Sequence, residues 1–489
     1  MTETTTLDED ALPWVGVGAR AAQPETRLVI LWSLDEPDRV GESAVITGKR
    51  VLGRGDSAGG DPAPRLRFGR TRPQGTVPGP PLQNARVSRL QLVLEALPDG
   101  RLSVASVGRS RLTVNGRECT EAVVGDGDTV HLRNAMLLLV TRRAPMPRLV
   151  AWTSRTEVPF GAPDPCGIVG ESRATWALRE ALAVAARSNH HVLLHGPSGA
   201  GKELAARAVH ALSERAARPL LARSAATFTE TLLDAELFGN VKNFPNVGTP
   251  ERPGLVGEAD GGALFLDEIG ELPTPLQAHL LRLLDRDGEY HRLGESRARR
   301  ADVRFIAATN RPLDALKHDF AARLTARVSL SGLDARPEDV PLLANALLER
   351  FRQKSPALAE RFFERRHGAL AEPRLDPDLV EMLVRHPWRL HTRELERLLF
   401  IAVSTSPGDY VTLTAEVLAE VAPVDETPAP DNVLRLPASA APPPDKARIE
   451  SALEAAEGRV AGAAERLGLS SRYVLYRLMR QYGIEAHTA

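Results

Sequence analysis

Short apolar runs separated by turn residues mark the first part of the chain. Between residues 27 and 143 these runs are Leu28–Trp32, Leu90–Leu94, Leu102–Val107, Leu112–Val114 and Met136–Val140. Short strands at this spacing are typical of an all-β sandwich, which we expect over residues 26–145 after a loose arm over residues 1–25. Six glycines and six prolines between residues 55 and 86 predict a long flexible loop within the sandwich.

A different pattern begins at residue 168, where buried strands alternate with helical stretches. The clearest strands are His191–His195, Ala263–Leu266 and Val303–Ala308. This alternation predicts an α/β domain over residues 166–333. Helical periodicity predicts an all-helical region over residues 334–421, with helices at Leu342–Phe351, Pro377–Arg385 and Arg393–Val403.

Proline-rich stretches divide these regions. Residues 146–165 and 422–445 predict linkers, and residues 446–489 contain three short helical stretches. The fold class is therefore multidomain: an all-β sandwich, an α/β domain with a helical lid, and a small all-α domain at the end.

Composition narrows the function classes only slightly. The 489 residues carry 62 Lys and Arg against 63 Asp and Glu, so the net charge of −1 identifies no partner. Two distant cysteines, Cys119 and Cys166, exclude a disulfide framework and a cysteine-built zinc site. The first ten residues are polar and acidic, and no apolar run approaches the ~18 residues needed to span a bilayer. We expect a cytoplasmic protein with no membrane partner.

A glycine-rich loop between a strand and a helix carries the strongest chemical signal. Phosphate oxygens need backbone N–H groups at close range, and a glycine-rich turn at a helix N-terminus provides them. A lysine in the loop supplies positive charge for the β- and γ-phosphates. These expected ATP-binding residues are Gly196, Pro197, Ser198, Gly199, Ala200, Gly201, Lys202 and Glu203.

Two carboxylates follow the buried strand Ala263–Leu266. Ligands bind outside the carboxyl ends of strands in open α/β sheets, so this pair is expected near the loop. Asp267 is the expected Mg²⁺ ligand, and Glu268 is expected to polarise an attacking water.

These residues and their neighbours resemble the AAA+ domain of sigma-54-dependent transcriptional activators over residues 168–405. The matching motifs are Ile168-Val-Gly-Glu-Ser172, the loop 196–203, Glu236-Leu-Phe-Gly239, Glu258-Ala-Asp-Gly-Gly262, Leu266-Asp-Glu-Ile-Gly-Glu-Leu-Pro273 and Ala307-Ala-Thr-Asn310. The resemblance implies a ring-forming ATPase that remodels RNA polymerase carrying sigma-54. It further implies that Glu naturally follows the loop lysine, that Asn310 is a first sensor, and that Arg393 is a second sensor in the helical lid.

The chain departs from this family's pattern at several positions. The loop that contacts sigma-54 reads Asn243-Phe-Pro-Asn-Val-Gly248 in place of Gly-Ala-Phe-Thr-Gly-Ala, and Pro245 stiffens it. The first arginine finger falls on Ala321 and the second on Arg327, with Arg323 nearby. Ser224 replaces the Asn that restrains the catalytic Glu, and Arg-Leu-His391 replaces Pro-Gly-Asn before the lid helix. We expect ATP binding and assembly with slow hydrolysis.

The N-terminal turns resemble those of a forkhead-associated domain, which binds phosphothreonine peptides. By this resemblance Arg54 and Ser88 are phosphate ligands, and Arg89 and Asn115 are supporting residues. Gln91 and Ser110 stand where the family has His and often Asn. The alternative is a sandwich used for dimerisation or docking.

The C-terminal segment resembles a Fis-type helix-turn-helix, in which a short helix, a turn at Gly468 and a basic helix follow one another. Ser471, Arg472 and Tyr473 are expected to reach base edges, and Arg477 and Arg480 to contact phosphates. The alternative is a three-helix dimerisation bundle.

Together these patterns predict a transcriptional regulator of the sigma-54 activator type, controlled by phosphothreonine binding. Its expected partners are promoter DNA, sigma-54 RNA polymerase, a phosphothreonine protein and further copies of itself, with ATP and Mg²⁺ as cofactors. A second interpretation is an ATP-stabilised DNA-binding oligomer that acts as a repressor or scaffold. A third is a phosphopeptide-binding adaptor with a structural AAA+ domain.

Overall fold

A computed structural model describes residues 23–56, 61–152, 158–227, 233–272, 274–285, 288–366, 369–421, 446 and 451–452. The chain divides into two compact units, residues 1–422 and 423–489. The expected arm, apart from residues 23–25, and the second linker lie outside the described residues. The same holds for almost all of the expected helix-turn-helix.

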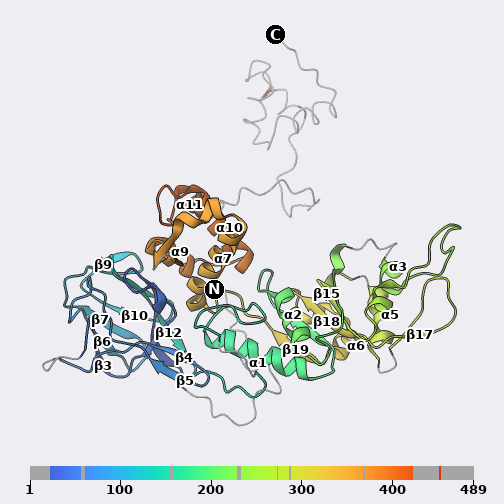
Figure 1. Cartoon of the computed structure of the whole chain (residues 1–489), viewed down its shortest axis with the longest axis horizontal. Coiled ribbons are helices and arrows are strands. Elements are labelled where there is room, and N and C mark those ends of the chain that lie inside the picture. The colour runs from blue at the N-terminus through green and yellow to red at the C-terminus, as the bar shows by residue number, and fades with distance from the viewer. Residues whose placement is uncertain are drawn as a thin grey trace. The chain divides into compact units, whose positions relative to one another are not determined.

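The N-terminal part is built from two antiparallel sheets that enclose one apolar core (Figure 1). The larger sheet has the order β5-β4-β2-β1-β12-β11-β8-β9, and the smaller has the order β10-β7-β6-β3. This arrangement confirms the predicted β class. The strands are β1 (Glu25–Ser33), β2 (Ser43–Val45), β3 (Lys49–Leu52), β4 (Gly69–Arg72), β5 (Gly75–Pro78), β6 (Leu92–Ala96), β7 (Leu102–Ser106), β8 (Leu112–Val114), β9 (Arg117–Cys119), β10 (Glu121–Val124), β11 (Thr129–Leu132) and β12 (Met136–Arg143).

The prediction of a long flexible loop over residues 55–86 was wrong for much of that segment. Strands β4 and β5 form a hairpin there, and β4 pairs with β2. Phe68 and Leu82 are buried in the sandwich core, at 1% and 4% exposure. These apolar side chains anchor the segment, which its glycine and proline content does not reveal.

The α/β part contains a five-stranded parallel sheet in the order β14-β15-β18-β13-β19. Apolar clusters line both of its faces, because its central strands β13, β15 and β18 are almost continuously apolar. The predicted α/β class is confirmed. The elements of this part are α1 (Arg173–Arg187), β13 (Val192–His195), α2 (Lys202–Ala211), β14 (Leu220–Ser224), α3 (Leu233–Phe238), α4 (Gly254–Glu258), β15 (Ala263–Asp267), α5 (Thr274–Leu284), β16 (Glu289–Tyr290), β17 (Arg299–Arg300), β18 (Arg304–Thr309), α6 (His318–Arg323) and β19 (Ala326–Ser329).

A helical lid follows, and its helices α7, α9 and α10 closely match the three predicted helices. A small hairpin of β20 and β21, which the sequence pattern does not predict, interrupts the lid. The elements of the lid are α7 (Val340–Lys354), α8 (Pro356–Ala359), β20 (Phe363–Arg366), β21 (Ala369–Pro373), α9 (Pro377–Arg385), α10 (His391–Thr405) and α11 (Ala415–Val421). Short 3₁₀ turns occur at η1 (Pro37–Arg39), η2 (Ala225–Thr227), η3 (Ile269–Glu271), η4 (Leu313–Ala315), η5 (Pro337–Asp339) and η6 (Glu360–Phe362).

One apolar cluster joins the sandwich to the lid. Strands β1 and β12 are buried on both faces: Leu28 and Ile30 point into the sandwich core, whereas Val29 and Leu31 pack with lid residues. Trp32 also belongs to this joint, and its Nε1 donates to the carbonyl oxygen of Leu375 at 2.7 Å. The continuous apolar runs at 28–32 and 136–140 are explained by this double burial.

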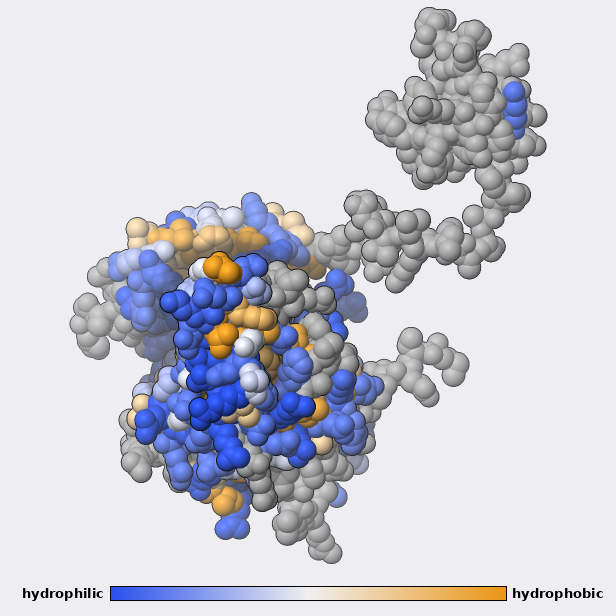
Figure 2. Space-filling model, turned by 90° about the vertical axis from the view of Figure 1, so that its right-hand side faces the viewer, coloured by the Kyte–Doolittle hydropathy of each residue, from blue (hydrophilic) through white to orange (hydrophobic). Residues whose placement is uncertain are grey.

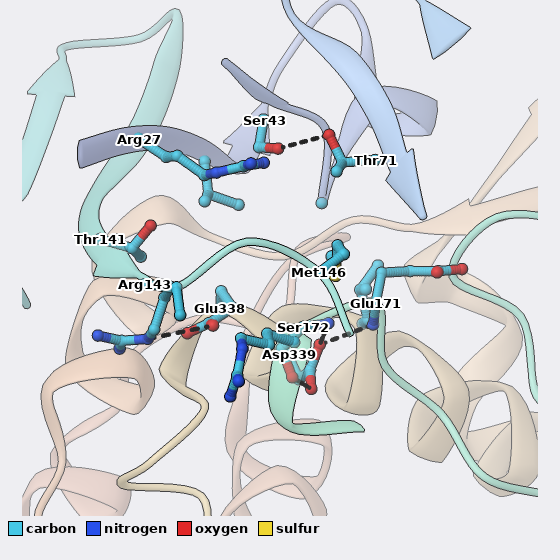
Figure 3. A pocket seen from close by; sticks show the side chains of 15 residues that line it. Arg27, Ser43, Thr71, Thr141, Arg143, Met146, Glu171, Ser172, Glu338 and Asp339 are labelled. Atoms are coloured by element: carbon cyan, nitrogen blue, oxygen red, sulfur yellow. Dashed lines mark hydrogen bonds and ion pairs between the residues drawn. The ribbon is translucent and has the colours of Figure 1, made fainter. Parts of the chain in front are cut away.

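A small cavity lies beside the joint (Figure 3). Arg143 at the end of β12 faces Glu338 in η5, with 3.6 Å between Nε and Oε1. Burial raises the pKa of Glu338 to about 7, although Arg143 opposes the rise. Asp339 accepts hydrogen bonds from the N–H groups of Glu171 and Ser172, which fixes the start of α1 against the lid.

The lid keeps apolar surface beyond this joint. Phe400 on α10 is 55% exposed, and Leu418 on α11 is 49% exposed. Apolar surface gathers over the lid in Figure 2.

Within the described part of the chain, no helix has both the length and the apolar character needed to cross a bilayer.

Candidate nucleotide-binding site

The glycine-rich loop lies at the carboxyl end of β13 and leads directly into α2. Gly201 caps the helix with a φ of 94°, and Gly199 has a φ of 81°. A Cβ atom at Gly199 would lie 2.0 Å from the carbonyl oxygen of Leu390, so glycine is required for the lid to approach the loop. Lys202, at the first turn of α2, donates from Nζ to the carbonyl oxygens of Gly196 and Pro197 at 2.9 and 3.0 Å.

Asp267 and Glu268 lie at the carboxyl end of β15, at the same edge of the sheet as the glycine-rich loop. Burial raises the pKa of Asp267 and lowers that of Lys202, while the attraction between their charges opposes both changes. Glu268 has a left-handed backbone, with φ of 54°. Ser224 donates from its hydroxyl to Glu268 Oε2 at 2.7 Å. The serine that replaces the family's Asn therefore still holds this carboxylate.

The lid contributes a second cation to the loop. Arg393 on α10 donates from Nη1 to the Ser198 hydroxyl at 3.3 Å, and the N–H of Thr392 donates to the carbonyl oxygen of Gly199 at 3.2 Å. His391, which replaces the family's Asn, has a φ of 47° and accepts a hydrogen bond from the N–H of Leu333. Burial lowers the pKa of His391, which keeps its ring neutral in this role.

The remaining expected residues divide into two groups. Asn310 follows β18, which lies between β13 and β15, so it is close in the sheet to both the loop and the carboxylates. Arg327 is exposed on β19 and donates to the carbonyl oxygen of Ala321 at 3.2 Å. On α6, Ala321 is buried in an apolar cluster, and Arg323 pairs with Asp285 at 2.9 Å.

A cavity of about 900 Å³ opens beside the loop. Ile168, Val169, Ala205 and Leu330 contribute apolar walls, and Gly201 lies at its edge. An apolar cavity next to a row of N–H donors and two cations fits a ligand with a flat ring and several phosphates. Asp267 and Glu268 add hard oxygen ligands, which suit Mg²⁺.

Two family models match the chain. The sigma-54 interaction domain matches residues 168–333, and the bacterial regulatory protein, Fis family, matches residues 444–482. The transcriptional regulatory protein ZraR of Salmonella typhimurium is 34% identical over 331 residues, covering 66% of this chain and 71% of that protein. The chain belongs to the sigma-54-dependent transcriptional activator family.

Other similar proteins carry related names. The anaerobic nitric oxide reductase transcription regulator NorR of Aeromonas hydrophila is 33% identical over 405 residues, covering 77% of this chain and 75% of that protein. A solved structure of NtrX from Brucella abortus in complex with ADP shares 29% identity with a TM-score of 0.45, covering 66% of this chain and 70% of that one.

In this activator, residues 243–248, the predicted sigma-54 contact, lie in a loop over residues 241–249. Its base is closed by the N–H of Asn243, which donates to the carbonyl oxygen of Thr249 at 2.8 Å. The amide of buried Asn240 donates to three carbonyl oxygens, those of Val241, Phe244 and Pro250. Val247 at the tip is 95% exposed. The loop therefore exposes an apolar side chain above a base that hydrogen bonds hold in place.

The expected phosphopeptide residues of the activator lie in turns of the sandwich. The N–H of Arg54 donates to the carbonyl oxygen of Ser88 at 3.0 Å, and the N–H of Arg109 donates to the Ser88 hydroxyl at 3.0 Å. Among the described residues, Arg54, Arg89 and Arg109 form no ion pair. The structure thus brings Arg54, Ser88 and Arg89 together, with Arg109 as a neighbour that the sequence comparison missed.

Gln91, one of the two substituted positions of the sandwich, and Asn115, an expected supporting residue, have structural roles. Gln91 is fully buried, and its Oε1 accepts from the N–H groups of Ser88 and Ser110 at 3.2 and 3.4 Å. Among the described residues, Asn115 forms no hydrogen bond with Arg54, Ser88, Arg89 or Arg109. It has a φ of 51° and bonds to Asp128 and to the N–H of Thr129.

The expected DNA-contacting residues of the activator, Ser471, Arg472, Tyr473, Arg477 and Arg480, lie outside the described residues. The matched Fis family range includes all of them.

Proposed function

We propose that this activator binds ATP with Mg²⁺ between the glycine-rich loop and the lid, and uses hydrolysis to remodel sigma-54 RNA polymerase. The observation that carries the proposal is the convergence of Lys202, Arg393 and the carboxylate pair on one loop next to a cavity of about 900 Å³. Loop amides 196–203 would surround the phosphates. Ile168 and Val169 would contact the base.

Each residue has a distinct proposed task in hydrolysis. Lys202 and Arg393 neutralise phosphate charge, and Glu268, held by Ser224, orients the attacking water. Asp267 would hold Mg²⁺, which neutralises charge on the phosphate oxygens. Asn310 contacts the γ-phosphate side of the site as the first sensor. Arg327 is exposed and acts on the ATP of a neighbouring subunit, so the active form is a homo-oligomer.

We further propose that the sandwich is a forkhead-associated domain that binds a phosphothreonine protein. Arg54, Ser88 and Arg89 supply donors to the phosphate, while Asn115 supports a neighbouring turn. The absence of ion pairs at Arg54 and Arg89 among the described residues leaves their charges available to an anion. Binding in this region would regulate the ATPase through the joint with the lid.

The C-terminal residues complete the proposal. Ser471, Arg472 and Tyr473 would read bases at promoter sites, and Arg477 and Arg480 would contact phosphates. These activities place the protein in the cytoplasm with its DNA.

Calorimetry of the full chain with ATP and Mg²⁺ tests the first step. The wild-type chain and the control Lys354→Ala, an exposed lysine on α7, should bind equally, whereas Lys202→Ala should lose binding. Equal heats from all three proteins would contradict the proposed site.

A second candidate function is repression or scaffolding by an ATP-stabilised oligomer. Ala321 favours it, because a buried alanine replaces the first arginine finger. Transcription from a sigma-54 promoter with purified components separates the two. ATP-dependent open-complex formation supports activation, whereas DNA binding without open complexes supports the second candidate.

A further inference from the structure

Three potential metal ligands meet where the sandwich contacts the lid. His131 lies on β11 of the sandwich, and Asp378 and Glu381 lie three residues apart on α9 of the lid. One ligand atom from each residue lies within 4.8 Å of the other two. The cluster is separate from the nucleotide site and from the expected phosphopeptide residues Arg54, Ser88 and Arg89.

The histidine points to a missing ligand. His131 is only 6% exposed, and its buried Nε2 has no hydrogen-bond partner among the described residues. Buried polar atoms are nearly always bonded, so an unpartnered ring nitrogen beside two carboxylates requires explanation.

Neighbouring groups hold the three side chains in place. The Thr129 hydroxyl donates to Glu381 Oε1, which orients that carboxylate. Asp376 caps α9 by accepting from the N–H of Asp378, which fixes the first turn of the helix. The edge of the Trp32 ring packs on the His131 ring, with 6.4 Å between centroids. Oriented supporting groups of this kind are typical of metal sites.

We propose that His131, Asp378 and Glu381 form a divalent transition-metal site, of the class that zinc occupies, which links the sandwich to the lid. One imidazole and two carboxylates suit such an ion, and ligands about 2.1 Å from zinc lie ~3.4 Å apart in a tetrahedral site. Small side-chain rotations would therefore bring the atoms from within 4.8 Å to that spacing. A water would supply the fourth ligand.

The local charges favour a cation. The carboxylates of Asp376, Asp378 and Glu381 favour positive charge at the ring, and Arg133 opposes them. The net negative charge would be balanced by a divalent ion. The competing arrangement is a protonated His131 paired with Glu381 and no metal, which is an outcome of the test below.

The full chain, stripped with a chelator and freed of any affinity tag, is dialysed against Zn²⁺ and its metal content is measured by emission spectrometry. The wild-type chain should retain about one equivalent more zinc than His131→Gln or Glu381→Gln. The control His190→Gln changes an exposed histidine outside the cluster and should match the wild type. ATP binding and circular dichroism verify that each variant is folded, and Glu381→Gln serves if His131→Gln does not fold.

Two further measurements locate the ion. Co²⁺ in place of zinc should give visible absorption bands that both variants lose, and Zn²⁺ should slow hydrogen exchange in β11 and α9 of the wild type. We expect the variants to bind at least tenfold more weakly. Equal zinc content in wild type and both variants, or exchange in β11 and α9 that ignores zinc, overturns the proposal and leaves the protonated ion pair as the explanation.

Discussion

The buried carboxyl of Glu338, beside the joint between the sandwich and the lid, predicts how the free energy of unfolding changes with pH. Its pKa lies near 7 in the folded chain against an ordinary value of 4.5, because burial penalises the charged form. Its Oε2 has no hydrogen-bond partner among the described residues. Arg143, 3.6 Å away, recovers only part of the lost solvation.

The sign follows from proton binding. Between pH 4.5 and 7 the folded chain holds the Glu338 proton more tightly than the unfolded chain does, so stability falls as pH rises through this window. Each pKa unit corresponds to about 1.4 kcal/mol, which gives a loss of about 3 kcal/mol above pH 7 relative to pH 4.5. Glu338→Gln removes the titration. Arg143 also pairs with Asp126 at 2.7 Å, and we expect this pair to remain in that variant.

Urea unfolding followed by tryptophan fluorescence, at pH 5 and pH 8.5, measures the effect. The free energy of unfolding of Glu338→Gln minus that of wild type should increase by roughly 2.5 kcal/mol from the lower to the higher pH. The control Glu121→Gln changes an exposed carboxylate on β10 and should show no such increase. A difference for Glu338→Gln that stays constant with pH would refute the reasoning.

Three other changes test the nucleotide site and the sandwich. Gly199→Ala should loosen the lid, because its Cβ would collide with the carbonyl oxygen of Leu390, and hydrogen exchange at residues 391–395 should become faster. Gly201→Ala is the control, since Gly201 has a similar positive φ but open space around its Cβ. Ser224→Ala should reduce ATP turnover about tenfold at unchanged ATP affinity, the loss expected for one hydrogen bond to a charged group, and an unchanged rate would contradict the role of Ser224. Arg54→Ala should weaken phosphothreonine-peptide binding to the full chain at least tenfold in a titration with phosphorylated and unphosphorylated peptides, whereas exposed Arg117→Ala should not.

Local patterns predicted the fold class and most elements correctly. The lid helix at Pro377–Arg385 has the predicted bounds, and the glycine-rich loop lies between a strand and a helix as expected. Periodicity and turn chemistry act over a few residues, so the sequence displays them directly. The structure also brings Lys202 and Arg393 to the same loop, although their roles remain predictions.

Long-range packing accounts for what the sequence did not reveal. The segment 55–86 looked like a loop because its buried anchors, Phe68 and Leu82, are isolated apolar residues among prolines and glycines. His131, Asp378 and Glu381 were missed because the histidine and the two carboxylates are far apart in the chain. The unbroken apolar run at 28–32 was the available sign that β1 is covered on both faces.

This double covering has a consequence for how the protein can be divided and recombined. A sandwich cut away at residue 145 would present Val29, Leu31, Leu137 and Leu139 to water, since these side chains are buried in the cluster shared with the lid. Such a fragment is expected to self-associate. A sandwich fused to an unrelated domain would lack the apolar lid surface that covers these side chains. The sandwich and the lid of this protein therefore share one apolar core, and moving the sandwich to another protein would require moving the lid helices with it.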